Sequence, residues 1–142
     1  MRPLLIAAAL AGLVLTIMGA MGGHAPRGAA SPDLVWMFDE RAWQSANVFG
    51  FAHVLAAALA ATLPLGGRLK LAAGWAFLLG VVLFAFSLML RQLMMAQYVP
   101  AATVDAVTSR YGAFLISVPV GGMCFMLGWI LLAIAAWRAP KV

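Results

Sequence analysis

The sequence contains very few charged residues. Only 9% of its 142 residues are Asp, Glu, Lys or Arg, whereas 65% are hydrophobic, and the mean hydropathy is +1.03. A soluble domain of this length cannot bury so much apolar surface. The scarcity of charge therefore argues against an ordinary soluble protein. It predicts an integral membrane protein with a single transmembrane domain, residues 1–142.

The residues that form catalytic and metal sites are equally scarce. The chain has four acidic residues, two histidines (His24 and His53) and one cysteine, Cys124. It contains no recognisable phosphate-binding glycine loop, catalytic triad, carboxylate pair or zinc motif. We therefore expect no enzymatic activity, no catalytic residue, no cofactor and no bound metal. The nine Lys and Arg are scattered singly, which favours helix ends beside anionic lipid over nucleic-acid binding.

Four long apolar segments are present, and they predict transmembrane helices over about residues 3–22, 45–63, 71–93 and 111–137. The first resembles a secretory signal peptide superficially, but its length of about 20 residues favours a helix that is retained. Trp36 and Trp43 lie among charged residues, which predicts a short interfacial helix over about residues 33–43. The predicted fold is all-α: an antiparallel bundle of four transmembrane helices with a short interfacial helix.

Small residues recur at helical spacing in every segment and predict the faces on which helices pack. The predicted faces are Ala8, Gly12, Thr16, Gly19 and Gly23 in the first segment, Ala46, Gly50, His53, Ala57 and Ala60 in the second, Ala72, Ala76, Gly80, Phe84, Ser87 and Arg91 in the third, and Ser117, Gly121, Cys124 and Gly128 in the fourth. Pro119 and Gly122 are predicted to take part in packing as well. The stretch 119–129 is predicted to be the central packing helix, bent at Pro119 because proline cannot donate to Leu115.

Four spans place both termini on one side of the membrane. That side would carry five Lys and Arg residues and the other side four. By the positive-inside rule, this small excess and the short turn near Arg68 and Lys70 predict cytoplasmic termini.

Four short motifs carry a resemblance to a known family. They are Gly19-Ala20-Met21-Gly22-Gly23-His24, Trp43-Gln44-Ser45-Ala46 followed by His53-Val54-Leu55-Ala56, Leu83-Phe84-Ala85-Phe86-Ser87-Leu88, and the set Pro119, Gly121, Gly122, Phe125, Gly128 and Trp129. The chain resembles a widespread bacterial family of small four-helix membrane proteins of unknown function, related to a small mitochondrial transmembrane protein of animals. The resemblance implies the four-helix fold and a bacterial inner (cytoplasmic) membrane, and it implies no particular activity.

His24, His53 and Arg91 are the candidate functional polar residues, because ionisable groups inside a membrane are often functional. One interpretation of the histidines is a metal or haem ligand or a proton relay. The interpretation we favour for His53 is a neutral imidazole hydrogen-bonded to a neighbouring helix, through Thr16 or the carbonyl of Leu115. Copper binding by the nine methionines is disfavoured, because they follow no repeated motif.

Two functions remain open from the sequence. The first is a non-catalytic membrane protein that packs with partners, either as a homo-oligomer or as an accessory subunit of a membrane complex, surrounded by membrane lipids and without nucleic acid. The alternative is a small ion or solute transporter or channel with His53 in its pathway. A continuous polar tunnel at His53 would favour transport, and a dry interior would favour packing.

Overall fold

The computed structural model of the chain describes residues 1–23, 40–65, 67–97 and 104–139. Its helices are α1 (Arg2–Gly23), α3 (Glu40–Thr62), α4 (Leu69–Gly80), α5 (Ser87–Gln97) and α6 (Val104–Trp137). A six-residue π-helical segment, η1 (Val81–Phe86), joins α4 to α5, so these three elements form one continuous helix. The described residues therefore build four long helices.

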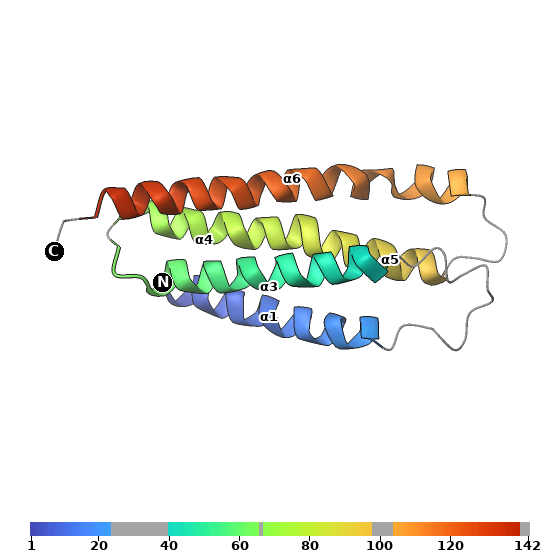
Figure 1. Cartoon of the computed structure of the whole chain (residues 1–142), viewed down its shortest axis with the longest axis horizontal. Coiled ribbons are helices and arrows are strands. Elements are labelled where there is room, and N and C mark those ends of the chain that lie inside the picture. The colour runs from blue at the N-terminus through green and yellow to red at the C-terminus, as the bar shows by residue number, and fades with distance from the viewer. Residues whose placement is uncertain (24–39, 66, 98–103, 140–142) are drawn as a thin grey trace.

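The four helices form an up-and-down bundle (Figure 1). Helices α1 and α4 run in one direction and α3 and α6 in the other, so α6 ends at the same end of the bundle at which α1 starts. Four segments are long and apolar enough to cross a membrane, namely Arg2–Gly22, Arg41–Thr62, Leu69–Leu93 and Ile116–Trp137. The predicted all-α antiparallel bundle of four membrane-length helices is confirmed.

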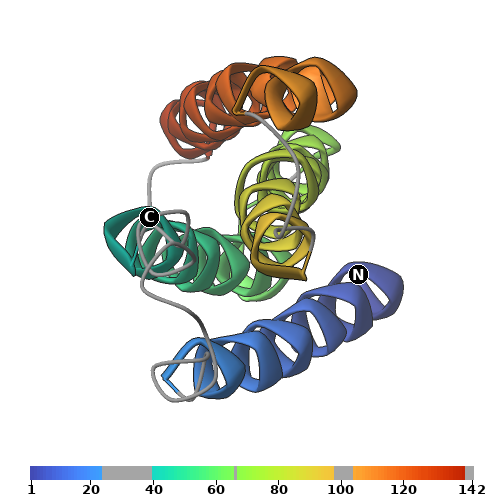
Figure 2. The same ribbon diagram turned by 90° about the vertical axis from the view of Figure 1, so that its right-hand side faces the viewer.

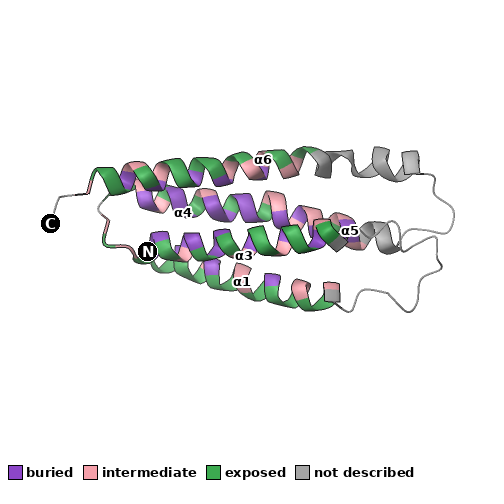
Figure 3. Ribbon diagram, in the orientation of Figure 1, coloured by how far each residue is buried: buried purple, intermediate pink, exposed green. Residues whose placement is uncertain are grey.

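The centre of the bundle is α4 rather than the predicted stretch 119–129 of α6. Helix α4 packs against α1, α3 and α6, and Figure 2 shows α1 and α6 on opposite sides of the α3–α4 pair. Its span is 50% buried, whereas the span of α6 is 28% buried. A helix with three neighbours needs apolar side chains on several faces. A stripe of small residues on one face therefore does not identify the central helix of the bundle. Figure 3 shows this burial along α4.

The predicted packing face of α3 is correct, because Ala46, Gly50, His53, Ala57 and Ala60 are all buried. The predicted faces of α1 and of the third segment are partly wrong. Thr16 is exposed and donates a hydrogen bond to the carbonyl of Gly12, while the neighbouring Leu15 is fully buried.

In the third segment, Ala72 is exposed and the next residue, Ala73, is fully buried. The π turn adds residues to one turn, so positions before and after η1 that share a face in a regular α-helix no longer do so. A face drawn with α-helical spacing from Ala72 to Arg91 therefore cannot be correct along its whole length.

The boundaries of two helices differ from the predicted ones at their starts. Helix α3 begins at Glu40, so residues 40–43 of the predicted interfacial helix belong to α3, and residues 33–39 lie outside the described part of the chain. Helix α6 begins at Val104 and continues through Pro119. The turn between α3 and α4 contains Gly67 with φ of 86°, a conformation that favours glycine.

Candidate functional site: an aromatic cluster around His53

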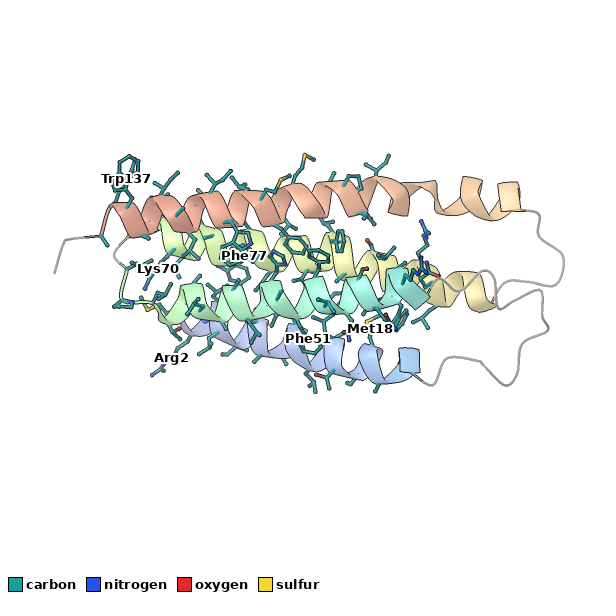
Figure 4. All side chains as sticks on the ribbon, in the orientation of Figure 1. Arg2, Met18, Phe51, Lys70, Phe77 and Trp137 are labelled. Atoms are coloured by element: carbon teal, nitrogen blue, oxygen red, sulfur yellow. The ribbon has the colours of Figure 1, made fainter. Side chains whose placement is uncertain are left out.

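Three helices bring a cluster of rings together in the middle of the bundle. Helix α3 contributes Phe49 and His53, the α4–η1 helix contributes Phe77 and Phe84, and α6 contributes Phe125 and Trp129. The α3 pair and the α6 pair are each spaced four residues apart, which places both members on one helical face. Figure 4 shows Phe77 between the helices at this level.

Both ring nitrogens of His53 are hydrogen-bonded. Nδ1 lies 2.8 Å from the carbonyl oxygen of Phe49, one turn earlier in α3, and the indole Nε1 of Trp129 lies 3.2 Å from Nε2. Because an indole N–H can only donate, Nε2 accepts and Nδ1 carries the proton. His53 is therefore a neutral imidazole with no ring nitrogen left for a ligand.

Other aromatic rings surround the ring of His53. Phe125 stacks on it with centroids 3.6 Å apart and an interplanar angle of 12°, and Phe77 lies 5.6 Å away. Phe77 in turn meets Trp129 edge-on at 5.0 Å. Only 7% of His53 is exposed. The imidazole thus joins α3 to α6 inside an apolar environment, and aromatic pairs of this geometry contribute about 0.5–1.5 kcal/mol each beyond their buried area.

Glycines make room for these rings. A Cβ atom on Gly128 would lie 2.5 Å from Cδ1 of Phe77, and one on Gly80 would overlap the ring of Phe125. A Cβ on Gly121 would lie 2.5 Å from the backbone nitrogen of Phe84. The predicted packing role of these three glycines agrees with the structure, because each allows a ring or a backbone to approach the helix.

The other predicted packing residues have different outcomes. A Cβ on Gly19 would lie 2.7 Å from Nδ2 of Asn47, one on Gly50 would lie 2.9 Å from Cδ2 of Leu15, and one on Gly12 would make an ordinary 3.5 Å contact. No atom lies within 4 Å of a Cβ placed on Gly122, and Pro119 is exposed. Among the described residues of this bundle, Gly122 and Pro119 contact no neighbouring helix in this way, so their predicted packing role stays a prediction.

A second polar group lies beside the π-helical segment. Ser117 of α6 donates to the hydroxyl of Ser87 at 2.9 Å, and Ser87 donates to the carbonyl of Leu83 within η1. Gln92, 1% exposed, follows one turn later, and the Nε atom of the half-buried Arg91 has no hydrogen-bond partner among the described residues. His24 lies outside the described residues.

Sequence reasoning missed two residues. Trp129 was expected to be a packing residue, but its indole holds His53. Lys70 was expected to mark the short turn, but it is only 3% exposed and its Nζ donates to the carbonyl of Leu63 at 2.6 Å. Its signal in the sequence is its place just after a tight turn, where a cation can bond the last carbonyls of the preceding helix. Thr16 does not bond His53, because its hydroxyl donates to Gly12.

Four of the described residues are His, Cys, Asp or Glu, namely His53, Cys124, Glu40 and Asp105. No group of three or more His, Cys, Asp or Glu that could hold a metal occurs among them. Cys124 is a free, half-buried thiol. The imidazole of His53 connects α3 to α6, because its Nε2 accepts from the indole of Trp129 while its Nδ1 donates to the carbonyl of Phe49.

The four apolar spans define a multi-pass membrane protein. The chain belongs to the family described as Protein of unknown function (DUF423), whose model matches residues 18–122 and thus covers most of the chain. The predicted resemblance to a family of unknown function is confirmed. The matched region contains His53 and Gly121 and ends before Phe125 and Trp129. Comparisons with the curated proteins and with the solved structures find no match.

Proposed function

We propose that this protein is a non-catalytic membrane protein that acts through helix–helix contacts, either as a homo-oligomer or as an accessory subunit of a larger membrane complex. The observation that carries this proposal is the bonding of His53, whose two nitrogens bond Phe49 and Trp129. A histidine that served a metal or a transported proton would need a free lone pair or an exchangeable partner. His53 instead stabilises the bundle.

The outer faces of α1 and α6 support a role in association. Only 17% of the α1 span is buried, and α6 exposes Met123, Met126 and Trp129. Gly122 lies on that side of α6 beside open space, so another helix could approach the backbone closely there. These faces are wide enough to leave surface for a partner in addition to lipid.

We propose the bacterial inner membrane as the location, with both termini cytoplasmic. The resemblance to bacterial membrane proteins supports the membrane, and the cations Arg2, Arg68, Lys70 and Arg138 at the end that carries the termini support the orientation. Cysteine accessibility measured on Ser45→Cys and on Arg138→Cys from each side of the membrane tests it, since the two positions lie at opposite ends.

Purification in a mild detergent at native expression, followed by native mass analysis, tests the proposed association. The expected result is a homo-oligomer or a complex with a second membrane protein. The sample should be compared with one carrying Gly122→Leu, which places bulk on the outer side of α6 where no atom of this chain lies within 4 Å. A strictly monomeric protein that co-purifies with nothing, before and after the substitution, contradicts the proposal.

A second candidate function is transport of an ion or small solute. The observation in its favour is the π-helical segment, because π turns in long helices are frequent at functional sites. Beside it lie the buried Ser87 and Gln92 and the half-buried Ser117. The aromatic enclosure of His53 argues against a pathway there. Solute flux into proteoliposomes should fall in Ser87→Ala and not in Ser45→Ala if this function holds.

A further inference from the structure

One end of the bundle carries cations and no described acidic residue. Arg2, Arg68, Lys70 and Arg138 all lie at the end where α1 begins and α6 finishes, as Figure 4 shows for Arg2 and Lys70. The acidic residues that the structure describes, Glu40 and Asp105, lie in the first turns of α3 and α6, at the opposite end. This end of the bundle is therefore positively charged.

Two of these cations are exposed at the start of neighbouring helices. Arg2 lies in the first turn of α1, and Arg68 directly precedes α4, whose first turn has no side-chain cap there. The two helices are in close contact, since a Cβ on Gly74 would overlap the side chain of Leu4. Lys70 differs, because its amine is buried and bonds Leu63.

An apolar groove lies between the same two helices, farther from this end. It has a volume of about 310 Å³ and is lined by Ala7, Ala11, Trp75, Leu78, Leu79 and Val82. Every lining side chain is apolar. At 1.5 Å per helical residue, the groove begins about 8 Å from Arg2 along α1 and about 10 Å from Arg68 along α4. Charged groups at the membrane surface and an apolar groove below them match the two parts of a lipid.

We propose that this region binds a phospholipid with a negatively charged headgroup. The guanidinium groups of Arg2 and Arg68 hold the phosphate, and one acyl chain lies in the groove against Ala7, Ala11 and Trp75. Charge selects the headgroup, because these cations have no described acidic neighbour and attract a headgroup with net negative charge, whereas in a zwitterionic lipid the choline cation offsets the charge of the phosphate. The proposal goes beyond the helix-packing function and stands whether or not the protein forms complexes.

Fluorescence quenching by brominated lipids tests this proposal, because Trp75 lines the groove and is 49% exposed. The full chain is placed in vesicles of phosphatidylcholine and phosphatidylglycerol, with bromine on the acyl chains of one lipid or the other. The signal of Trp75 is the difference between the protein and its Trp75→Phe variant. We expect brominated phosphatidylglycerol to quench Trp75 more strongly than the same mole fraction of brominated phosphatidylcholine.

Arg2→Gln and Arg68→Gln should each lower this preference about fivefold. The matched control is Arg138→Gln, which removes a cation at the same end but directly after α6, the helix on the opposite side of the α3–α4 pair from α1. Ala11→Phe should fill the groove and remove the quenching, whereas Ala133→Phe on the exposed side of α6 should not. Arg2→Lys and Arg68→Lys keep the charge and should retain most of the preference, which separates lost binding from misfolding.

Five results would overturn the proposal. Equal quenching by the two lipids would show that the charge of the headgroup does not affect binding. An equal loss in Arg138→Gln would show a general surface potential rather than a site. Stronger quenching by brominated phosphatidylglycerol than by brominated phosphatidylcholine in Ala11→Phe would show that no acyl chain lies in the groove. If brominated lipid does not quench Trp75 and two chains cross-link through Ala11→Cys, a second copy of the chain occupies the groove instead. If inorganic phosphate relieves the quenching, the arginines form a site for free anions.

Discussion

The two sides of the central α4–η1 helix use the same kind of residue against different neighbours. On the α6 side, a Cβ on Gly121 would lie 2.5 Å from the backbone nitrogen of Phe84 and 2.9 Å from the backbone carbon of Leu83. On the α1 side, the three atoms nearest to a Cβ on Gly74 belong to the side chain of Leu4. On the α6 side, glycine therefore allows two backbones to come close together. On the α1 side, it leaves room for a flexible side chain.

This difference predicts how firmly each outer helix is held. A side-chain end can rotate away from a new methyl group, whereas a backbone can move only with its whole helix. The cluster of His53, Phe125 and Trp129 adds specific contacts on the α6 side, and the α1 span is only 17% buried. We therefore expect α6 to be fixed to the core and α1 to adjust more easily.

Gly121→Ala is the strongest test of this comparison. Its new methyl group would meet the backbone of η1, and we expect the free energy of unfolding to fall by about 3 kcal/mol, at the upper end of overpacking effects. Titration of the detergent-solubilised protein with SDS, followed by circular dichroism, measures this change. The neighbouring Gly122→Ala is the matched control, since no atom lies within 4 Å of its Cβ, and it should change stability by less than about 0.5 kcal/mol. Similar effects of the two substitutions would show that α6 does not approach η1 as described.

His53→Ala should have the next largest effect. It removes the hydrogen bond from Trp129 and the stacking with Phe125, and we expect a loss of about 2 kcal/mol. Trp129→Phe keeps an aromatic ring and removes only the donor, so it should cost about 0.6 kcal/mol, the average for hydrogen bonds between membrane helices. The same SDS titration measures both. No haem absorbance or bound metal should be lost in either variant, and the loss of one would make His53 a ligand instead.

The sequence predicts the four spans because length and apolar content alone decide whether a helix can cross a membrane. It also predicts the buried face of α3, where small residues and one histidine share a helical stripe. Gly121 and Gly122 show where prediction ends. Both are small and adjacent, and only the position of another helix determines which of them is in contact.

The remaining errors have the same origin in contacts distant along the chain. The partner of His53 is Trp129, 76 residues later, and no local pattern joins them. The π segment depends on the hydrogen bonding of one turn, and it displaces the face that regular spacing predicts after Gly80. The burial of Lys70 follows from its bond to the end of α3, which a count of charges at a helix end does not reveal.

Gly74→Ala should have a smaller effect than either change on the α6 side. The added methyl group meets only the side chain of Leu4, which can change rotamer near the end of α1. We expect a loss of about 1 kcal/mol in the SDS titration. Gly74→Ala combined with Leu4→Ala should recover part of this loss, because the smaller side chain removes the overlap. A loss as large as that of Gly121→Ala would contradict the proposed difference between the two sides.

Gly12→Ala should have the smallest effect, and its sign should be opposite. A Cβ at this position of α1 would lie 3.5 Å from Cγ1 of Val54, which is an ordinary van der Waals contact. The substitution restricts the unfolded chain and favours the helix, so we expect stability to rise by about 0.5 kcal/mol. Thr16 donates to the carbonyl of Gly12, and since alanine leaves that carbonyl unchanged, the hydrogen bond should persist. Thr16→Val, measured in both backgrounds, separates the contribution of that bond from the effect of the methyl group. Destabilisation by more than about 1 kcal/mol in Gly12→Ala would mean that α1 lies closer to α3 than this contact implies, and α1 would then be held as tightly as α6.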